Sequence, residues 1–187
     1  MRVAVLQGGD SAEAEVSRSS AREVALALNE HGHAATCIEL DAQLTQHLLA
    51  AEPDVVFPAL HGPPGEDGTV QGYLEMLGLA YVGGDVGASA FAMHKAAAKL
   101  LFAEAGLPVA RGLSFSNGAD INDAIDSIEA TLGQRVVMKP QASGSALGVT
   151  LLPNGGDLRA ALTDALTNGD VLVEPFVAGR EITCGLL

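Results

Sequence analysis

The chain has 187 residues, 48% of them hydrophobic, which is enough to build one domain or two small ones around buried cores. Its 23 acidic residues outnumber its 10 lysines and arginines, and the formal net charge of −13 argues against nucleic acid or an anionic membrane as partner. Any phosphate bound here must therefore be met by locally placed lysines and backbone N–H groups.

The cysteines and the first residues indicate where the protein works. Cys37 and Cys184 lie far apart and fit no CxxC or metal-ligand spacing, so we expect two reduced thiols and a cytoplasmic location. The apolar start ends at Gly8-Gly9, too early for a signal peptide, and no apolar run approaches the ~20 residues of a membrane span. We therefore expect a soluble protein that is not exported.

The first part of the chain alternates short apolar runs with helical patterns, which is typical of βαβ units and a parallel sheet. Strands are expected at residues 3–6, 35–40 and 55–58, and helices at 44–51, at 69–77 and from a cap at Asp10 or Ser11 to Gly32. Ligands collect at the carboxyl ends of parallel strands. Gly8-Gly9 and His61-Gly62 would both lie there.

The second part begins with one long helical pattern at 88–105, which ends at Gly106-Leu107-Pro108. A new cycle follows, with strands at 109–115, 136–139, 149–152 and 171–173 and helices at 120–132 and from Asp157. We expect an α/β fold in which a Rossmann-like parallel sheet with flanking helices (1–93) precedes a central α+β part (94–178). The last run, 181–187, reads as a strand just beginning, which indicates a truncated chain.

Residues 136–151 read as strand, lysine, Ser/Gly-rich loop and strand. Lys139 at the strand end supplies a point charge, the loop glycines let the backbone approach an anion, and the serines add donors. The lysine, the glycines and the serines all suit the binding of a polyphosphate. Taken alone, an ordinary hairpin with an exposed lysine explains the segment equally well.

Three other segments combine acidic residues with glycines. Residues 61–72 join a strand end to a helix start and hold more glycines than a simple helix cap needs. Residues 8–15 form a good helix N-terminus, and this is the interpretation we prefer for Glu15. Glu174 and Glu181 flank the end of a buried strand, where carboxylates bind ribose hydroxyls or an exocyclic amine, or form salt bridges such as one to Arg180.

In this order, these segments resemble the N-terminal half of the D-alanine–D-alanine ligases, members of the ATP-grasp superfamily. The resemblance covers nearly the whole chain and rests on a series of spaced motifs: Gly8-Gly9-x-Ser11-x-Glu13-x-Glu15-Val16-Ser17, residues 61–72, Met93-His94-Lys95 with Lys99, Gly106-Leu107-Pro108, Val137-Met138-Lys139-Pro140 and residues 174–181. It implies a pre-ATP-grasp substrate-binding domain (1–93), a central ATP-grasp subdomain (94–178) and the start of a C-terminal ATP-grasp subdomain (179–187), the rest of which is missing.

The resemblance also implies a reaction. The carboxylate of one D-alanine attacks the γ-phosphate of ATP to give an acyl phosphate, and the amine of a second D-alanine displaces the phosphate, making the dipeptide used in peptidoglycan. Positioned cations suit this chemistry better than a covalent nucleophile. A cytoplasmic homodimer that uses Mg²⁺ or Mn²⁺ is implied as well.

The nucleotide roles carry over by position. Lys95 and Lys139 would hold the ATP phosphates, Glu174 and Glu181 would face adenine and ribose, and Ser145 would lie where phosphate and substrate meet.

The substrate roles carry over in the same way. Glu13 would anchor the ammonium group of the first D-alanine and help orient Ser145, and His61 would lie near the carboxylate of that substrate. Glu13 and Ser145 are thus the implied catalytic residues.

Three positions depart from the family pattern: His94 where an acid is common, Ala146 in place of a loop serine, and Pro175 in place of a lysine, which removes a backbone N–H. The family's metal ligands lie downstream of residue 187, and no metal-ligand set can be assembled from this sequence. We therefore expect the 187 residues alone not to catalyse ligation. The alternatives are another ATP-grasp carboxylate–amine ligase and a non-catalytic nucleotide-binding remnant.

Overall fold

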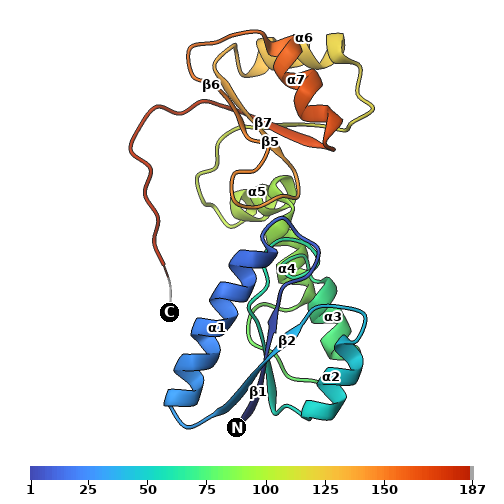
Figure 1. Ribbon diagram of the computed structural model, residues 1–187. Coiled ribbons are helices and arrows are strands. Elements are labelled where there is room, and N and C mark those ends of the chain that lie inside the picture. The colour runs from blue at the N-terminus through green and yellow to red at the C-terminus, as the bar shows by residue number, and fades with distance from the viewer. Residues whose placement is uncertain (186–187) are drawn as a thin grey trace. The chain divides into compact units, whose positions relative to one another are not determined.

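The computed structural model describes residues 1–185 (Figure 1). The chain divides into two compact units, the first spanning Met1–His94 and the second beginning at Lys95. Each unit has its own sheet and its own hydrophobic core. Over the described residues, none of the helices has both the length and the apolar character that crossing a membrane requires.

The first unit is built on a three-stranded parallel sheet in the order β2-β1-β3. Its elements follow one another as β1 (Arg2–Gln7), α1 (Ala14–Glu30), β2 (Ala34–Glu39), α2 (Leu44–Ala51), β3 (Val55–Pro58), α3 (Thr69–Met76) and α4 (Val86–Met93). In the central strand β1, Val5 is paired with Cys37 on one side and with Phe57 on the other. The expected Rossmann-like parallel sheet with flanking helices is confirmed.

Helices cover both faces of this sheet, and the sequence of β1 explains why. Ala4 and Leu6 pack into a buried cluster with α2 and α3, whereas Val3 and Val5 pack against α1. An unbroken apolar run is what a strand buried on both faces requires, because successive side chains point to opposite sides. Strand β1 is therefore fixed in the middle of the sheet, and the loop that follows it lies at the carboxyl ends of the strands.

The second unit contains a four-stranded antiparallel sheet in the order β4-β7-β5-β6. Its elements are α5 (Lys95–Glu104), β4 (Leu113–Phe115), α6 (Ile121–Thr131), β5 (Val136–Pro140), β6 (Thr150–Leu152), α7 (Leu158–Thr167) and β7 (Val171–Pro175). Helices α6 and α7 share a core with this sheet that includes the fully buried Ile128, Met138 and Leu162 (Figure 1). The expected central α+β architecture is confirmed.

The single helix expected at 88–105 is wrong, because the chain forms two helices that break at His94. His94 adopts an extended backbone conformation with φ −89° and ψ 97°. The backbone N–H of the next residue, Lys95, donates to the carbonyl of Gln141 at 3.0 Å instead of to a carbonyl in the preceding turn. Helix α5 therefore starts afresh on the loop that follows β5.

Three element ends also differ from expectation. Helix α1 is capped by neither Asp10 nor Ser11: it begins at Ala14 after Glu13, and no side chain caps it. The strand expected at 109–115 is confined to Leu113–Phe115. Residues 181–185 form no helix or strand, and the last two positions of the strand expected there lie outside the described residues.

Candidate functional site

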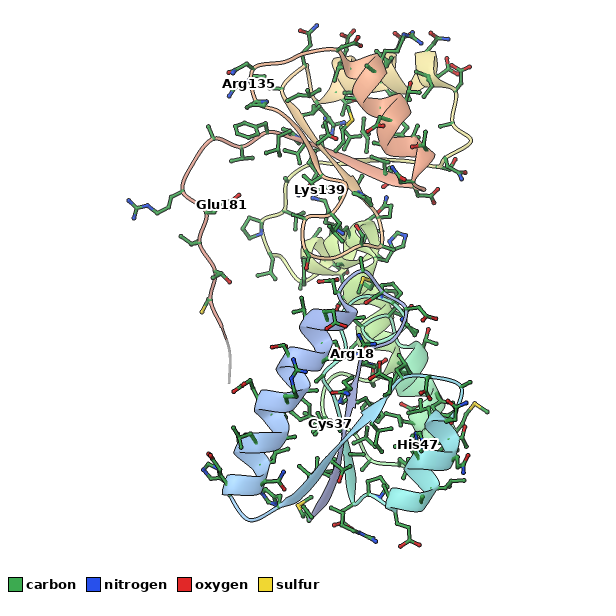
Figure 2. The ribbon with its side chains drawn as sticks, in the orientation of Figure 1. Arg18, Cys37, His47, Arg135, Lys139 and Glu181 are labelled. Atoms are coloured by element: carbon green, nitrogen blue, oxygen red, sulfur yellow. The ribbon has the colours of Figure 1, made fainter. Side chains whose placement is uncertain are left out.

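The chain contains three lysines, and all of them belong to the second unit. Lys95 and Lys99 are one helical turn apart on α5, whereas Lys139 is near the end of β5, where Figure 2 labels it. The seven other cationic residues are arginines. A chain with net charge −13 thus has all of its lysine side chains in the second unit.

Two of these lysines bind one buried carboxylate. Glu174 on β7 has a side chain that is 9% exposed. Its Oε2 accepts a hydrogen bond from Lys139 Nζ at 2.6 Å, and its Oε1 accepts one from Lys99 Nζ. Val137 is directly opposite Glu174 in the β5–β7 pairing. Lys139, two residues further along β5, is therefore the diagonal neighbour of Glu174 on the same face of the sheet.

These ion pairs set the charge of Glu174. Burial alone would raise its pKa, but the hydrogen bonds from Lys139 and Lys99 hold the pKa below its ordinary value. The carboxylate is therefore ionised at neutral pH. Two lysines for one carboxylate leave an excess of positive charge, which the third lysine increases.

Lys95 connects this cluster to the Ser/Gly loop. Its Nζ donates to the carbonyl of Ser143, in the loop between β5 and β6. Burial, and then the positive charge of Lys139, lower the pKa of Lys95. A polyphosphate supplies the negative charge that such a group of amines lacks.

The loop itself has an unusual backbone. Ser145 and Ala146 have φ values of 48° and 56°, in the left-handed region that non-glycine residues rarely adopt, and Gly148 has φ 71°. The loop is closed by hydrogen bonds from Leu147 N to Gly144 O at 3.1 Å and from Ser143 Oγ to Leu147 O at 3.3 Å. Residues in this region cluster at binding sites, where surrounding structure maintains them.

Glu181 is not brought to the lysines. It is exposed, in the segment after β7 that forms no helix or strand as far as residue 185. Figure 2 shows it away from the strand that carries Lys139. Glu174 forms its ion pairs with Lys99 and Lys139 and not with Arg180, the salt bridge considered from the sequence.

In the first unit, the loops after β1 and β3 bring Glu13 and His61 together. Ser11 links them, because its Oγ donates to the carbonyl of His61 at 2.9 Å and accepts from the backbone N–H of Glu13 at 3.2 Å. Gly62 lies between the two, and a Cβ added there would be 3.4 Å from Glu13 Oε2. His61 Nε2 is 3.4 Å from the hydroxyl of Ser20 on α1. The two residues expected to bind the first substrate thus share one loop cluster.

Ser17 holds the same two loops and had no role in the sequence analysis. It is fully buried on α1, where its Oγ accepts from the backbone N–H of Gly8 at 2.9 Å and donates to the carbonyl of Ala59 at 2.7 Å. The sequence held a signal for it. Ser17 precedes Ala21 and Ala25 at four-residue spacing, which places it on the buried face of the helix.

Gln141 is the corresponding residue of the second unit. It is buried at the start of the Ser/Gly loop, its side-chain amide nitrogen donates to Ser114 Oγ at 2.9 Å, and its Oε1 accepts from the backbone N–H of Ala96 at 3.2 Å. It therefore joins the first turn of α5, which carries Lys95, to β4 and the loop.

The described residues offer no metal centre. Across residues 1–185, three or more His, Cys, Asp or Glu side chains do not come together in a group that could hold a metal ion. The carboxylate nearest the lysines, Glu174, already uses both oxygens in ion pairs. The described residues therefore supply no site for Mg²⁺ or Mn²⁺ made of three or more such side chains.

Comparison with known proteins relates these features to a family. Residues 41–84 match the family described as D-ala D-ala ligase N-terminus, and residues 101–187 match D-ala D-ala ligase C-terminus. The whole chain is 43% identical to a D-alanine–D-alanine ligase of Desulforudis audaxviator and 44% identical to that of Gluconobacter oxydans, and covers 61% of each. The chain thus spans about three fifths of the length of the curated relatives that it matches.

Solved structures agree. A D-alanine–D-alanine ligase from Bacillus anthracis superposes on 96% of this chain with a TM-score of 0.83 and 30% identity, and the chain covers 58% of it. The same enzyme complexed with ATP gives a TM-score of 0.81. The fold, both halves of the sequence and the relatives all point the same way: the chain belongs to the D-alanine–D-alanine ligase family.

Proposed function

We propose that this chain supplies the ATP-binding and first-substrate-binding parts of an ATP-dependent D-alanine–D-alanine ligase. The observation that carries the proposal is the placement of all three lysines at Glu174 or at the Ser/Gly loop: Lys99 and Lys139 bind Glu174, and Lys95 binds the carbonyl of Ser143 in the loop. ATP is the polyphosphate chosen because a solved relative, 30% identical, is a complex with ATP. D-alanine is chosen because the curated relatives are named for it.

In this proposal the second unit binds the nucleotide. Lys95 and Lys139 contact the phosphates, where their charges oppose the negative charge that shifts during phosphoryl transfer. Ser145 donates from the loop to the phosphate and substrate. Glu174 and Glu181 keep their proposed roles at adenine and ribose, and Glu174 also orients the ammonium group of Lys139.

The first unit binds the first D-alanine. The Glu13 carboxylate pairs with the substrate ammonium, a charge-assisted hydrogen bond that fixes its orientation. His61 lies toward the substrate carboxylate, the group that is phosphorylated. With this carboxylate held still, its attack on the γ-phosphate becomes a positioned reaction that needs no covalent enzyme intermediate. The homodimer and the cytoplasmic location remain predictions from the family resemblance.

The proposal gives no role to a metal ion. The family resemblance implies a divalent cation, but residues 1–185 provide no cluster of three or more possible ligands for one, so no step is assigned to it.

The test measures binding and turnover with the same purified 187-residue chain. Isothermal titration with ATP should give a 1:1 signal that Lys139→Ala weakens at least about tenfold, as expected for loss of one charged contact. Arg22→Ala, which removes an exposed charge on α1 in the first unit, is the control and should bind ATP normally. Absence of ATP binding by the wild-type chain would refute the proposal.

A second measurement separates the candidate activities. ADP formation is followed with and without D-alanine, and with other amino acids as the first substrate. ADP formation that depends on D-alanine supports the ligase reaction, and dependence on another amino acid supports a different carboxylate–amine ligase. ATP binding without ADP formation assigns only the binding step to this chain.

A further inference from the structure

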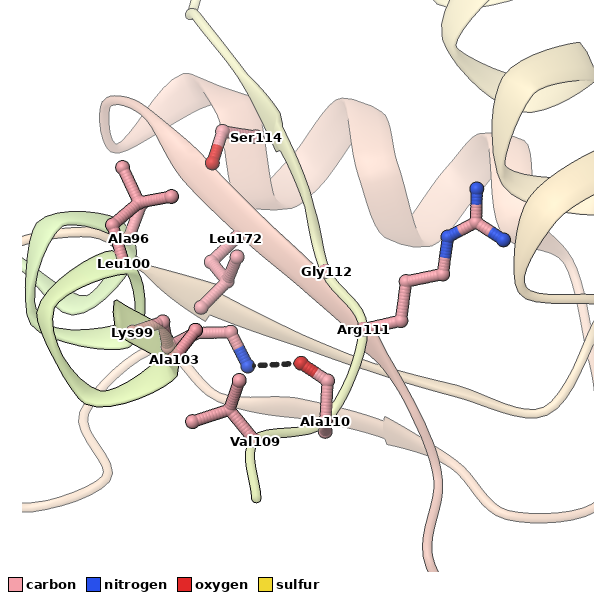
Figure 3. Close-up of a pocket in the computed structure, with 10 residues that line it drawn as sticks. All are labelled: Ala96, Lys99, Leu100, Ala103, Val109, Ala110, Arg111, Gly112, Ser114 and Leu172. Atoms are coloured by element: carbon pink, nitrogen blue, oxygen red, sulfur yellow. Dashed lines mark hydrogen bonds between the residues drawn. The ribbon is translucent and has the colours of Figure 1, made fainter. Parts of the chain in front are cut away.

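Lys99 has none of the roles assigned so far, although its side chain is the less exposed one of the two lysines that contact Glu174. Its side chain is 19% exposed, against 33% for Lys139. Its Nζ donates to Glu174 Oε1. It also donates to the carbonyl of Ala110, the hydrogen bond that is dashed in Figure 3. One ammonium group therefore connects α5, the segment before β4, and β7.

The surroundings of Lys99 favour a fixed position. Its stem lines a cavity of about 310 Å³ with mostly apolar neighbours, among them Leu100, Val109 and Leu172 (Figure 3). Gly112 lies beside it: an added Cβ there would be in ordinary contact with Lys99 Cε, at 3.4 Å, but too close to Leu172 Cδ1, at 2.9 Å. An ion pair with little surrounding water is stronger than a solvated one.

Lys99 and Lys139 each bind a different oxygen of the Glu174 carboxylate. Lys99 takes Oε1 and Lys139 takes Oε2, so Glu174 is held at both oxygens and cannot turn toward either lysine alone. Lys95 lies near Lys139, and burial and then the positive charge of Lys139 lower the pKa of Lys95, but its Nζ donates to the carbonyl of Ser143. Without Lys99, Glu174 would be free to pair with Lys139 alone and to neutralise it.

We propose that Lys99 is a positioning residue: by occupying one oxygen of Glu174, it fixes the carboxylate that holds Lys139 and keeps that carboxylate from neutralising Lys139, which takes up a polyphosphate. This inference rests on the proposed ATP-binding function and adds a role that the phosphate contacts do not describe. Lys99 acts through Glu174 and does not itself contact the nucleotide.

The first test is a double-mutant cycle read by isothermal titration with ATP on the 187-residue chain. Lys99→Met should weaken ATP binding about tenfold, the scale of one charged hydrogen bond. Lys99→Arg, which keeps the charge, should remain within about threefold of wild type. In a Glu174→Gln background, Lys99→Met should change binding less than about twofold, because the residue through which it acts is already altered.

The second test measures a property that a merely structural role would leave unchanged. The carboxyl ¹³C signal of Glu174, assigned by its loss in Glu174→Gln, reports its titration midpoint. That midpoint should rise in Lys99→Met and stay low in Lys99→Arg, because the Lys99 hydrogen bond is one of the two that lower the pKa of Glu174.

The outcomes are distinguishable. If wild type does not bind ATP, the proposed function fails and this role fails with it. If wild type binds and Lys99→Met binds equally well, only the role of Lys99 is overturned. An additive effect of Lys99→Met in the Glu174→Gln background, or an unchanged midpoint, would overturn it too. Should Lys99→Met fail to fold, a Lys99→Arg midpoint at the value of a solvated glutamate would be the contrary result.

Discussion

Replacing Glu174 by glutamine tests whether the buried ion pairs stabilise the second unit. The change keeps the size and polarity of the side chain but removes the charge that Lys99 and Lys139 both bind. Breaking a fully buried pair costs about 3–5 kcal/mol. Because these lysines are 19% and 33% exposed and keep part of their hydration, we expect about 2 kcal/mol at pH 7.

Urea unfolding of the wild type and of Glu174→Gln at several pH values measures this difference. The pKa of Glu174 in the folded protein lies below its ordinary value of 4.5, so its ionised form contributes stability above that pH. The contribution is lost as the pH falls below 4.5 and through the lower folded pKa. The two proteins should therefore differ at pH 7 and converge in acid. Equal stability at pH 7, or a difference that grows in acid, would refute the reasoning.

Two predictions concern the loop after β1. Ser17→Ala leaves one buried backbone N–H and one carbonyl without their partner, and should lower the free energy of unfolding, measured by thermal unfolding, by about 2 kcal/mol. The control Ser19→Ala, at an exposed position on the same helix, should lower it by less than about 0.5 kcal/mol. Equal losses in the two variants would contradict this prediction. Gly8→Ala places a Cβ 1.7 Å from Glu39 Oε1, so the Glu39 carboxylate must rotate away and give up its ion pair with Arg18. We expect this to cost about 0.5–1 kcal/mol more than Gly32→Ala, which has a similar positive φ but open space. Similar unfolding midpoints would count against the clash.

Much of the fold could be predicted from the sequence because its signals are local. The apolar run 3–6, the glycines that end helices and strands, and the caps at Asp120 and Asp157 depend on residues a few positions apart. The break at His94 could not be predicted in this way. Residues 88–105 are good helix formers throughout, and the break depends on a hydrogen bond to Gln141, which is distant in the sequence.

The same distinction applies to the candidate site. Lys139 and its loop were recognisable because a strand, a lysine and a Ser/Gly loop follow one another directly. The ion pair between Lys99 and Glu174 joins residues 75 positions apart and depends on how α5 packs beside β7. Periodicity places Lys99 one turn from Lys95 but does not identify its partner. The nucleotide role predicted for Glu174 gave no sign that two lysines would also hold its carboxylate.

The distribution of charge explains how so acidic a chain can take up an anion. At physiological ionic strength, interactions between exposed charges are screened beyond about 8 Å, so most of the acidic residues have little effect on a phosphate at the lysines. Partly buried charges a few ångströms away act far more strongly, because water and salt screen them less. Here Glu174 is the acidic partner of two lysines, and both of its oxygens are already used. Local excess of positive charge, not the net charge of −13, therefore decides whether a polyphosphate is attracted.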